Sequence, residues 1–206
     1  MGYTTSFHGH FSLDKPLAAE HKVYLEAFSD TRRMKRNSAK TEKMKDKRRK
    51  DAALPIGIDG GFYVGDQEDF GQSKTSDVLD YNSPPAGQPG LWCQWVPTED
   101  GMGMEWNQSE KFYHYTEWLT YLIDNFLKPW GYVVNGNVSW TGEDSDDLGR
   151  IWVKNNVVKA VKTQLLNDEP DWGDSIPEPL DEVDVAPSPI EDVIADALML
   201  KGDEDD

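Results

Sequence analysis

The stretch from Glu110 to Val158 constrains the fold more than any other part of the chain, because a strong helical pattern is followed directly by strands and turns. After Ser109, a residue that can cap a helix, apolar side chains recur at spacings of three and four until Pro129. The strands expected after this helix lie at 130–140, 150–154 and 157–162, separated by turns at 142–149 and 155–156. A helix laid across such a meander buries both apolar faces, so the stretch predicts an α+β core.

The first half of the chain adds further strands and a second helix. Residues 3–13 alternate apolar and polar side chains, which predicts a half-buried strand. Asp14 as a cap and Pro16 in the first turn predict a helix that ends near Arg32. Further strands are expected at 55–64, 91–97 and 102–106, the last two forming a hairpin around 98–101. We therefore expect one α+β domain over residues 1–164, an antiparallel sheet or meander packed by two helices.

Residues 165–206 differ from the rest of the chain in composition. They contain fifteen acidic residues, five prolines and a single lysine. The apolar side chains that remain are too few for their burial to offset the conformational entropy lost on folding. We expect a disordered acidic tail. Within it the segment 190–200 has apolar residues at helical spacing and is a candidate contact for a partner protein. These residues are Ile190, Val193, Ile194 and Leu198.

The basic residues are concentrated in a segment that we call the basic arm, residues 32–50. It holds eleven Lys or Arg and two acidic residues, although the whole chain carries a net charge of −17. With no apolar periodicity, it predicts a solvated loop or a frayed helical extension. Such an arm could neutralise phosphates of nucleic acid. The candidate residues are Arg32, Arg33, Lys35, Arg36, Lys47, Arg48, Arg49 and Lys50. The acidic body and tail favour an alternative, a protein that mimics nucleic acid and occupies the basic surface of a DNA-binding partner.

A second charged feature is the acidic turn, in which Glu143, Asp144, Asp146 and Asp147 fall within five residues. Such carboxylates can bind a divalent cation weakly, but the spacing of a calcium-binding EF-hand loop is absent. A solvated turn that contacts a basic partner is the favoured interpretation.

No catalytic or cofactor motif is present in the sequence. There is no Gly-x-Ser-x-Gly elbow, P-loop or dinucleotide-binding glycine pattern. His8 and His10 share one strand face, but two imidazoles are too few for a metal site. Cys93 is expected to be a buried, inert thiol inside a strand. An enzyme would need a pocket formed by the long loop 65–90, with Asp77, Asp80 and Tyr81 as its polar groups. We expect no cofactor and no bound metal.

The sequence also predicts where in the cell the protein is located. It has no apolar leader segment and no run of eighteen apolar residues, and its single cysteine excludes an internal disulfide. These features predict a cytoplasmic protein that does not enter the membrane.

Several motifs together resemble a group of small proteins from bacteriophages and some actinobacteria that have no assigned activity. They are MGYTTSFHGHF, LDKPL, the Thr-Arg-Arg after the first helix, GQPGLWCQW, EKFYHYTEWL and WGYVVNGNVSWTGEDSDDLGRI. The likeness covers residues 1–160 and omits the tail. It implies a phage or mobile-element context and no catalytic residue. We therefore expect a non-enzymatic accessory protein that binds a host or phage protein through acidic and aromatic surfaces.

Overall fold

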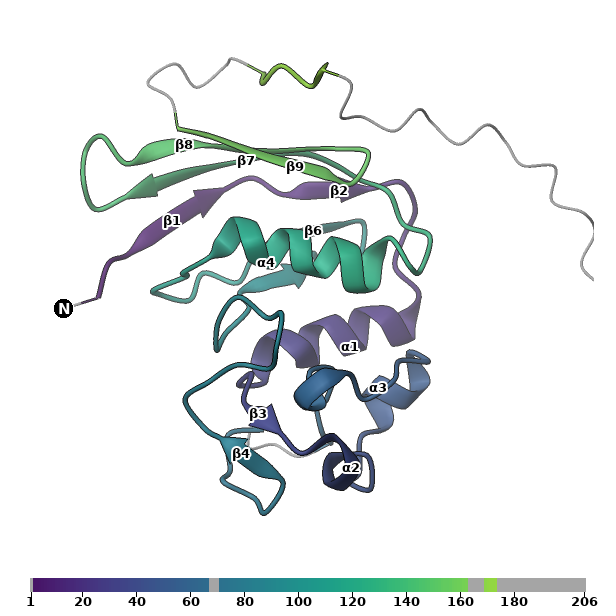
Figure 1. Ribbon diagram of the computed structural model, residues 1–206. Helices are drawn as coiled ribbons and strands as arrows, with labels where there is room; N and C mark the ends of the chain where they lie inside the picture. The colour runs from purple at the N-terminus through teal and green to yellow at the C-terminus, as the bar shows by residue number, and fades with distance from the viewer. Residues whose placement is uncertain (1, 67–70, 163–168, 174–206) are drawn as a thin grey trace, which may run out of the picture. The chain divides into compact units, whose positions relative to one another are not determined.

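The computed structural model describes residues 2–66, 71–162 and 169–173 (Figure 1). The chain divides into one compact unit over residues 1–176 and a second over residues 177–206. The second unit lies outside the described residues, as does the segment 190–200 with Ile190, Val193, Ile194 and Leu198. Most of the predicted tail therefore stays a prediction.

The compact unit is built on an antiparallel sheet, as expected. Its order is β5-β6-β2-β7-β8-β9, with β1 also paired to β7. The strands are β1 Thr5–His8, β2 Phe11–Leu13, β5 Trp95–Pro97, β6 Gly103–Trp106, β7 Val134–Gly142, β8 Leu148–Lys154 and β9 Val157–Lys162. The α+β fold class is thus confirmed, and with it the hairpin β5–β6 and the meander β7–β8–β9.

Strand β7 is central, since it pairs with β1 and β2 on one side and with β8 on the other. Phe7 lies opposite Trp140 and Phe11 opposite Gly136, so β1 and β2 keep a single register along β7. The predicted strand at 3–13 is therefore one strand interrupted near Gly9, where φ is +102°. Its alternation places Phe7 and Phe11 in the core.

Two helices supply the apolar surface that the sheet covers. Helix α1 spans Ala19–Asp30, and α4 spans Tyr115–Leu122 and continues as a π-helical segment, η2, over Ile123–Leu127. Helix α4 contacts both β5 and β9, the two edges of the sheet, so the sheet curls around it (Figure 1). Helix α1 contacts β5.

The start of α4 differs from the prediction. Ser109 does not cap it; the helix begins at Tyr115, after His114 with φ of +56°. Gln108 and Lys111 are also left-handed, with φ of +64° and +63°. Three such residues turn the chain between β6 and α4, and Phe112, which the pattern places in the helix, is buried before the helix begins.

Residues 31–90 form a layer of short elements below α1 in Figure 1. They are β3 Lys35–Arg36, α2 Ser38–Thr41, α3 Lys47–Asp51, η1 Ile58–Gly60 and β4 Val78–Asp80. The strand expected at 55–64 is wrong, because Asp59 and Gly60 have positive φ and the segment forms a single 3₁₀ turn. β3 pairs with β4 from the long loop 65–90.

The expectation that the basic arm is a solvated loop is also wrong. Arg33, Arg36 and Arg49 are each 2 to 3% exposed. The Arg33 guanidinium donates to the carbonyls of Gly61 and Tyr63 at 2.9 and 2.8 Å. Arginine presents five donors in a fixed fork, so it can hold irregular backbone whose carbonyls have no strand partner.

Arg36 and Arg49 make ion pairs inside this layer. The Arg36 guanidinium lies 2.8 Å from Asp77, and both side chains are less than 5% exposed. Arg49 lies 2.8 Å from Asp46, which is fully buried. Burial alone raises the pKa of Asp77, but hydrogen bonds from Thr75 and Arg36 outweigh that effect and hold the pKa below its ordinary value.

We predict that Asp77→Asn lowers the free energy of unfolding by about 3–5 kcal/mol, because it leaves the buried Arg36 guanidinium without a carboxylate. Denaturant unfolding at neutral pH measures the change. Asp51→Asn is the matched control, since Asp51 pairs with Lys47 at the surface and its loss should have little effect. Equal midpoints for the two variants would contradict the assignment.

The same variant has a defined pH dependence. The folded-state pKa of Asp77 lies below its unfolded value, so its stabilisation is complete above the ordinary carboxyl pKa and is lost as pH falls through the lower, folded value. The difference between wild type and Asp77→Asn should therefore be constant near neutrality and shrink below about pH 4. If the stability difference between wild type and Asp77→Asn grows as pH falls, the pKa of Asp77 is not lowered in the folded state.

Candidate functional site

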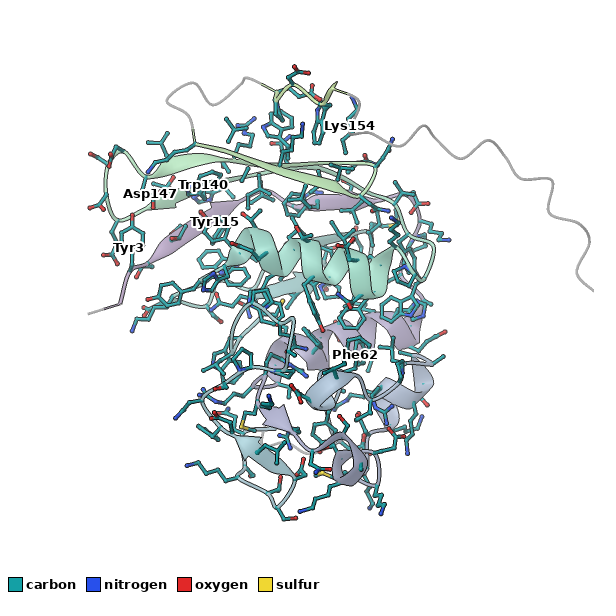
Figure 2. All side chains as sticks on the ribbon, in the orientation of Figure 1. Tyr3, Phe62, Tyr115, Trp140, Asp147 and Lys154 are labelled. Carbon is teal, nitrogen blue, oxygen red and sulfur yellow. The ribbon has the colours of Figure 1, made fainter. Side chains whose placement is uncertain are left out.

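The acidic turn is bound to the N-terminal strand rather than freely solvated. Figure 2 shows Tyr3, Trp140 and Asp147 together at one end of the sheet. Tyr3 donates to Asp147 at 2.7 Å, and the Thr4 amide donates to Glu143 at 2.7 Å. The hydrogen bond from Tyr3 outweighs partial burial and holds the pKa of Asp147 below its ordinary range. Asp144 and Asp146 are exposed and remain candidate contacts.

The remaining residues of the basic arm are partly engaged in local contacts. The Arg32 guanidinium stacks over the Tyr81 ring at 4.3 Å, Lys35 lies 3.4 Å from Asp59, and Lys47 pairs with Asp51. Arg48 is half-buried and Lys50 is exposed. Together with the burial of three arginines, these contacts leave no continuous row of free cations among the eight predicted residues.

The three residues of loop 65–90 that the sequence indicated for a pocket, Asp77, Asp80 and Tyr81, are each engaged in local contacts. Asp77 is buried with Arg36, whereas Asp80 accepts hydrogen bonds from the Asn82 amide and the Ser83 hydroxyl within its own turn. Tyr81 lies against Arg32. Each side chain therefore has a structural role in the layer around Arg36.

The histidines and the cysteine considered for metal binding or catalysis also lack, among the described residues, the partner groups that such chemistry needs. His8 and His10 are exposed, and within the described ranges no group of three His, Cys, Asp or Glu side chains is arranged to hold a metal. Cys93 is buried, as expected, but it lies just before β5 rather than inside a strand. Burial raises the pKa of its thiol to about 12, which removes it as a nucleophile at neutral pH.

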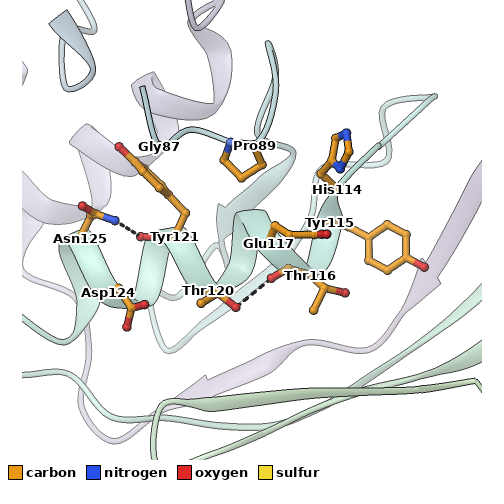
Figure 3. A pocket seen from close by; sticks show the side chains of 10 residues that line it. All are labelled: Gly87, Pro89, His114, Tyr115, Thr116, Glu117, Thr120, Tyr121, Asp124 and Asn125. Atoms are coloured by element: carbon orange, nitrogen blue, oxygen red, sulfur yellow. Dashed lines mark hydrogen bonds between the residues drawn. The ribbon is translucent and has the colours of Figure 1, made fainter. Parts of the chain in front are cut away.

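A surface groove that the sequence did not indicate runs along α4 and the start of η2. It consists of two hollows of about 750 and 500 Å³ that adjoin at Pro89 and His114. We call it the α4 groove. Figure 3 shows its polar half, where Thr116, Thr120 and Asp124 line one wall.

The second half of the α4 groove is aromatic. Its lining includes Trp92, Tyr113 and Trp118, and the Tyr113 side chain is 51% exposed. Large exposed aromatic side chains next to a hollow are typical of protein-binding surfaces. Sequence periodicity did not find this site because Trp92 and Tyr113 belong to irregular segments on opposite sides of the β5–β6 hairpin.

The floor of the aromatic half contains an unused hydrogen-bond donor. Trp118 is 0% exposed, and its indole Nε1 has no hydrogen-bond partner among the described residues. Gly90 lies beside this atom, since a Cβ at Gly90 would lie 3.6 Å from Nε1. A buried donor without an acceptor costs about 1–3 kcal/mol, which an acceptor supplied by a ligand would recover.

The groove is also bordered by strained backbone. Gln108, Lys111 and His114 are left-handed, and the last two line the aromatic half. A non-glycine residue in this conformation costs about 1–2 kcal/mol. Clustered strain of this kind is found at ligand-binding sites, where it fixes the position of side chains.

A second chain of contacts links the groove to the buried arginines. Gln88 accepts from Arg33 Nε at 3.3 Å and donates to the Tyr121 hydroxyl at 3.0 Å. Tyr121 lines the polar half of the groove. Arg33, which the sequence placed in the basic arm, thus helps to position the Tyr121 side chain that lines the groove.

Comparisons with protein-family models, with curated proteins and with solved structures find no match to this chain. Across the described part of the chain, no helix combines the length and the apolar character needed to span a bilayer.

The backbone strain in the turn between β6 and α4 is testable. We predict that Gln108→Gly raises the free energy of unfolding by about 1 kcal/mol, because glycine adopts the left-handed conformation without steric cost. Ser109→Gly is the control: its φ is not positive, so added freedom of the unfolded chain should lower stability. Denaturant titration compares the two. A loss of stability in Gln108→Gly would contradict strain at this position.

Proposed function

We propose that this protein is a non-enzymatic interaction module that binds an extended, basic segment of a partner protein in the α4 groove. The observation that carries the proposal is the aromatic half of the groove with the unpaired Nε1 of Trp118 in its floor. Extended peptides present a backbone carbonyl at regular intervals, and aromatic-lined grooves bind them through such donors and through stacked apolar or proline side chains.

The charge of the groove supports a basic ligand. Glu110, Glu117 and Asp124 are exposed along it, against one exposed cation, Lys111. Charge complementarity of this kind raises association rates and selects partners. The exposed carboxylates Asp144 and Asp146 of the acidic turn are proposed as additional contacts.

Binding is coupled to a local backbone shift in this proposal. Because Trp118 is fully buried and Gly90 lies beside its Nε1, a ligand carbonyl reaches the donor only when the backbone around Gly90 moves. Gly90 has no positive φ and its missing Cβ leaves ordinary contact space, so alanine there adds cover without a clash. Gly90→Ala is consequently a variant that affects ligand access more than stability.

The resemblance to phage proteins adds a context. Under it the partner is a host or phage protein and the site of action is the host cytoplasm. Nucleic-acid binding by the basic arm is not favoured, since Arg33, Arg36 and Arg49 face oxygen atoms of the protein.

A library of random linear peptides tests the proposal. Selection on the wild-type protein should enrich sequences that combine Lys or Arg with Pro or aromatic residues. We predict that Tyr113→Ala and Gly90→Ala each weaken the binding of the selected peptides about tenfold or more, a loss of about 1.4 kcal/mol. The first removes an exposed ring that lines the aromatic half, and the second adds a methyl group beside Trp118 Nε1. Fluorescence titration measures the affinities.

Two controls distinguish binding in the groove from non-specific binding to exposed apolar side chains. Leu79→Ala removes an equally exposed apolar side chain outside the groove and should leave binding unchanged. Glu117→Lys should weaken basic peptides and reduce their dependence on salt. If no peptide is enriched, or if selected peptides bind Tyr113→Ala as tightly as wild type, the proposal fails.

A further inference from the structure

The face of the sheet turned away from α4 has an unusual charge for this molecule. The strands β1, β2, β7, β8 and β9 contain no Asp or Glu, although the chain has a net charge of −17. On the side opposite the buried Ile151 and Val153, β8 presents Arg150, Trp152 and Lys154. We call this surface the outer face.

The strand register arranges these residues in rows. Trp152 lies between Asn137 of β7 and Lys159 of β9, and Arg150 lies opposite Ser139. The Arg150 guanidinium is 5.5 Å from the Trp152 ring. A half-exposed tryptophan in the middle of a sheet, flanked by cations and small polar side chains, has the composition of a platform on which nucleic-acid bases stack.

Two donors on the outer face have no acceptor. Arg150 Nε and Trp152 Nε1 are both buried atoms without a hydrogen-bond partner among the described residues. They belong to alternate residues of one strand and therefore lie on the same side of the sheet. Unpaired donors beside a stacking surface point to a ligand that brings oxygen or nitrogen acceptors.

A segment of the chain itself occupies part of this face. Residues 169–173, which we call the strap, lie over β8 and β9 on the side opposite α4 (Figures 1 and 2). Trp172 of the strap is 7% exposed, and the ammonium groups of Lys159 and Lys154 lie 5.3 and 5.9 Å from its ring. Glu169 lies 4.0 Å from Lys154 and accepts from Trp172 Nε1 at 2.8 Å.

The strap thus combines the two elements of a single-stranded nucleic acid, anionic groups along a backbone and an aromatic ring. We propose that the outer face binds single-stranded nucleic acid and that the strap is an internal competitor for it. The Glu169 carboxylate takes the position of a phosphate at Lys154, and the Trp172 ring takes the position of a base between Lys154 and Lys159. A duplex keeps the faces of its bases stacked inside the helix, so the preferred ligand is single-stranded.

The proposal concerns a different surface from the α4 groove, on the other side of the sheet. Sequence analysis assigned nucleic-acid binding to residues 32–50; here the contacts come from Arg150, Trp152, Lys154 and Lys159. Failure of peptide binding therefore does not contradict oligonucleotide binding, and the reverse also holds.

Fluorescence anisotropy with a labelled oligo-dT strand and the full chain tests the proposal. Trp172→Ala should bind the strand at least about fivefold more tightly than wild type at low salt, because the strap loses the ring that packs against Lys154 and Lys159 and competes less well for them. Binding should weaken as salt increases. Circular dichroism verifies that the variant keeps the sheet.

Second variants locate the binding surface. Adding Lys154→Ala and Lys159→Ala to Trp172→Ala should abolish the gain, whereas Lys43→Ala with Lys45→Ala, exposed positions of the basic arm, should retain it. The proposal is overturned if Trp172→Ala binds no more tightly than wild type, if the gain survives loss of Lys154 and Lys159, or if duplex DNA binds equally well. Binding of an acidic tryptophan-containing peptide without binding of the oligonucleotide would assign the face to peptides and would also overturn it.

Discussion

The structure depends on edge-to-face packing of aromatic rings around Phe7. Its ring contacts Trp95, Trp106, Phe112 and Tyr115, with centroid distances of 4.8 to 5.8 Å. These rings come from β5, β6, the turn before α4, and α4 itself. Because one side chain of β1 joins these segments, the curled sheet and the first turn of α4 hold fixed positions. The α4 groove keeps its shape because Phe7 packs against Phe112 and Tyr115, which hold the left-handed residues before α4 in place.

A second, polar core complements the aromatic one. Arg33, Arg36 and Arg49 each bind backbone carbonyls or carboxylates from several loops. Hydrogen bonds to guanidinium groups therefore hold the described loops between residues 31 and 90, in addition to the burial of apolar side chains such as Met34 and Val64. Such an arrangement is sensitive to the loss of one partner, because a buried charge without its counter-ion costs far more than a lost surface pair. It also positions Gln88, and through it the Tyr121 hydroxyl in the groove.

The sheet separates two surfaces of opposite character. On the α4 side, the groove combines exposed carboxylates with Trp92 and Tyr113 and suits a basic, extended peptide. On the outer face, Arg150, Lys154 and Lys159 surround Trp152 and hold the acidic strap. In both places an indole N–H lacks an acceptor, at Trp118 and at Trp152. Arg33 Nη1 in the polar core is also a buried donor without a partner in the described part of the chain, so such donors mark these two surfaces only together with the groove lining and the strap.

The sequence alone determined the hairpin β5–β6 and the meander β7–β8–β9, but not the pairing of β1 and β2 with β7 or the small sheet of β3 and β4. Alternation predicted the strand at 3–13, and Asn155 and Asn156, both at positive φ, predicted the turn that sets the register of β8 and β9. It did not determine the role of the basic arm, because an arginine is buried only when carbonyls as distant as those of Gly61 and Tyr63 converge on it. The α4 groove and the strap likewise join segments far apart in the chain. Local periodicity records which side of an element is apolar; which segments meet on that side is decided by tertiary packing alone.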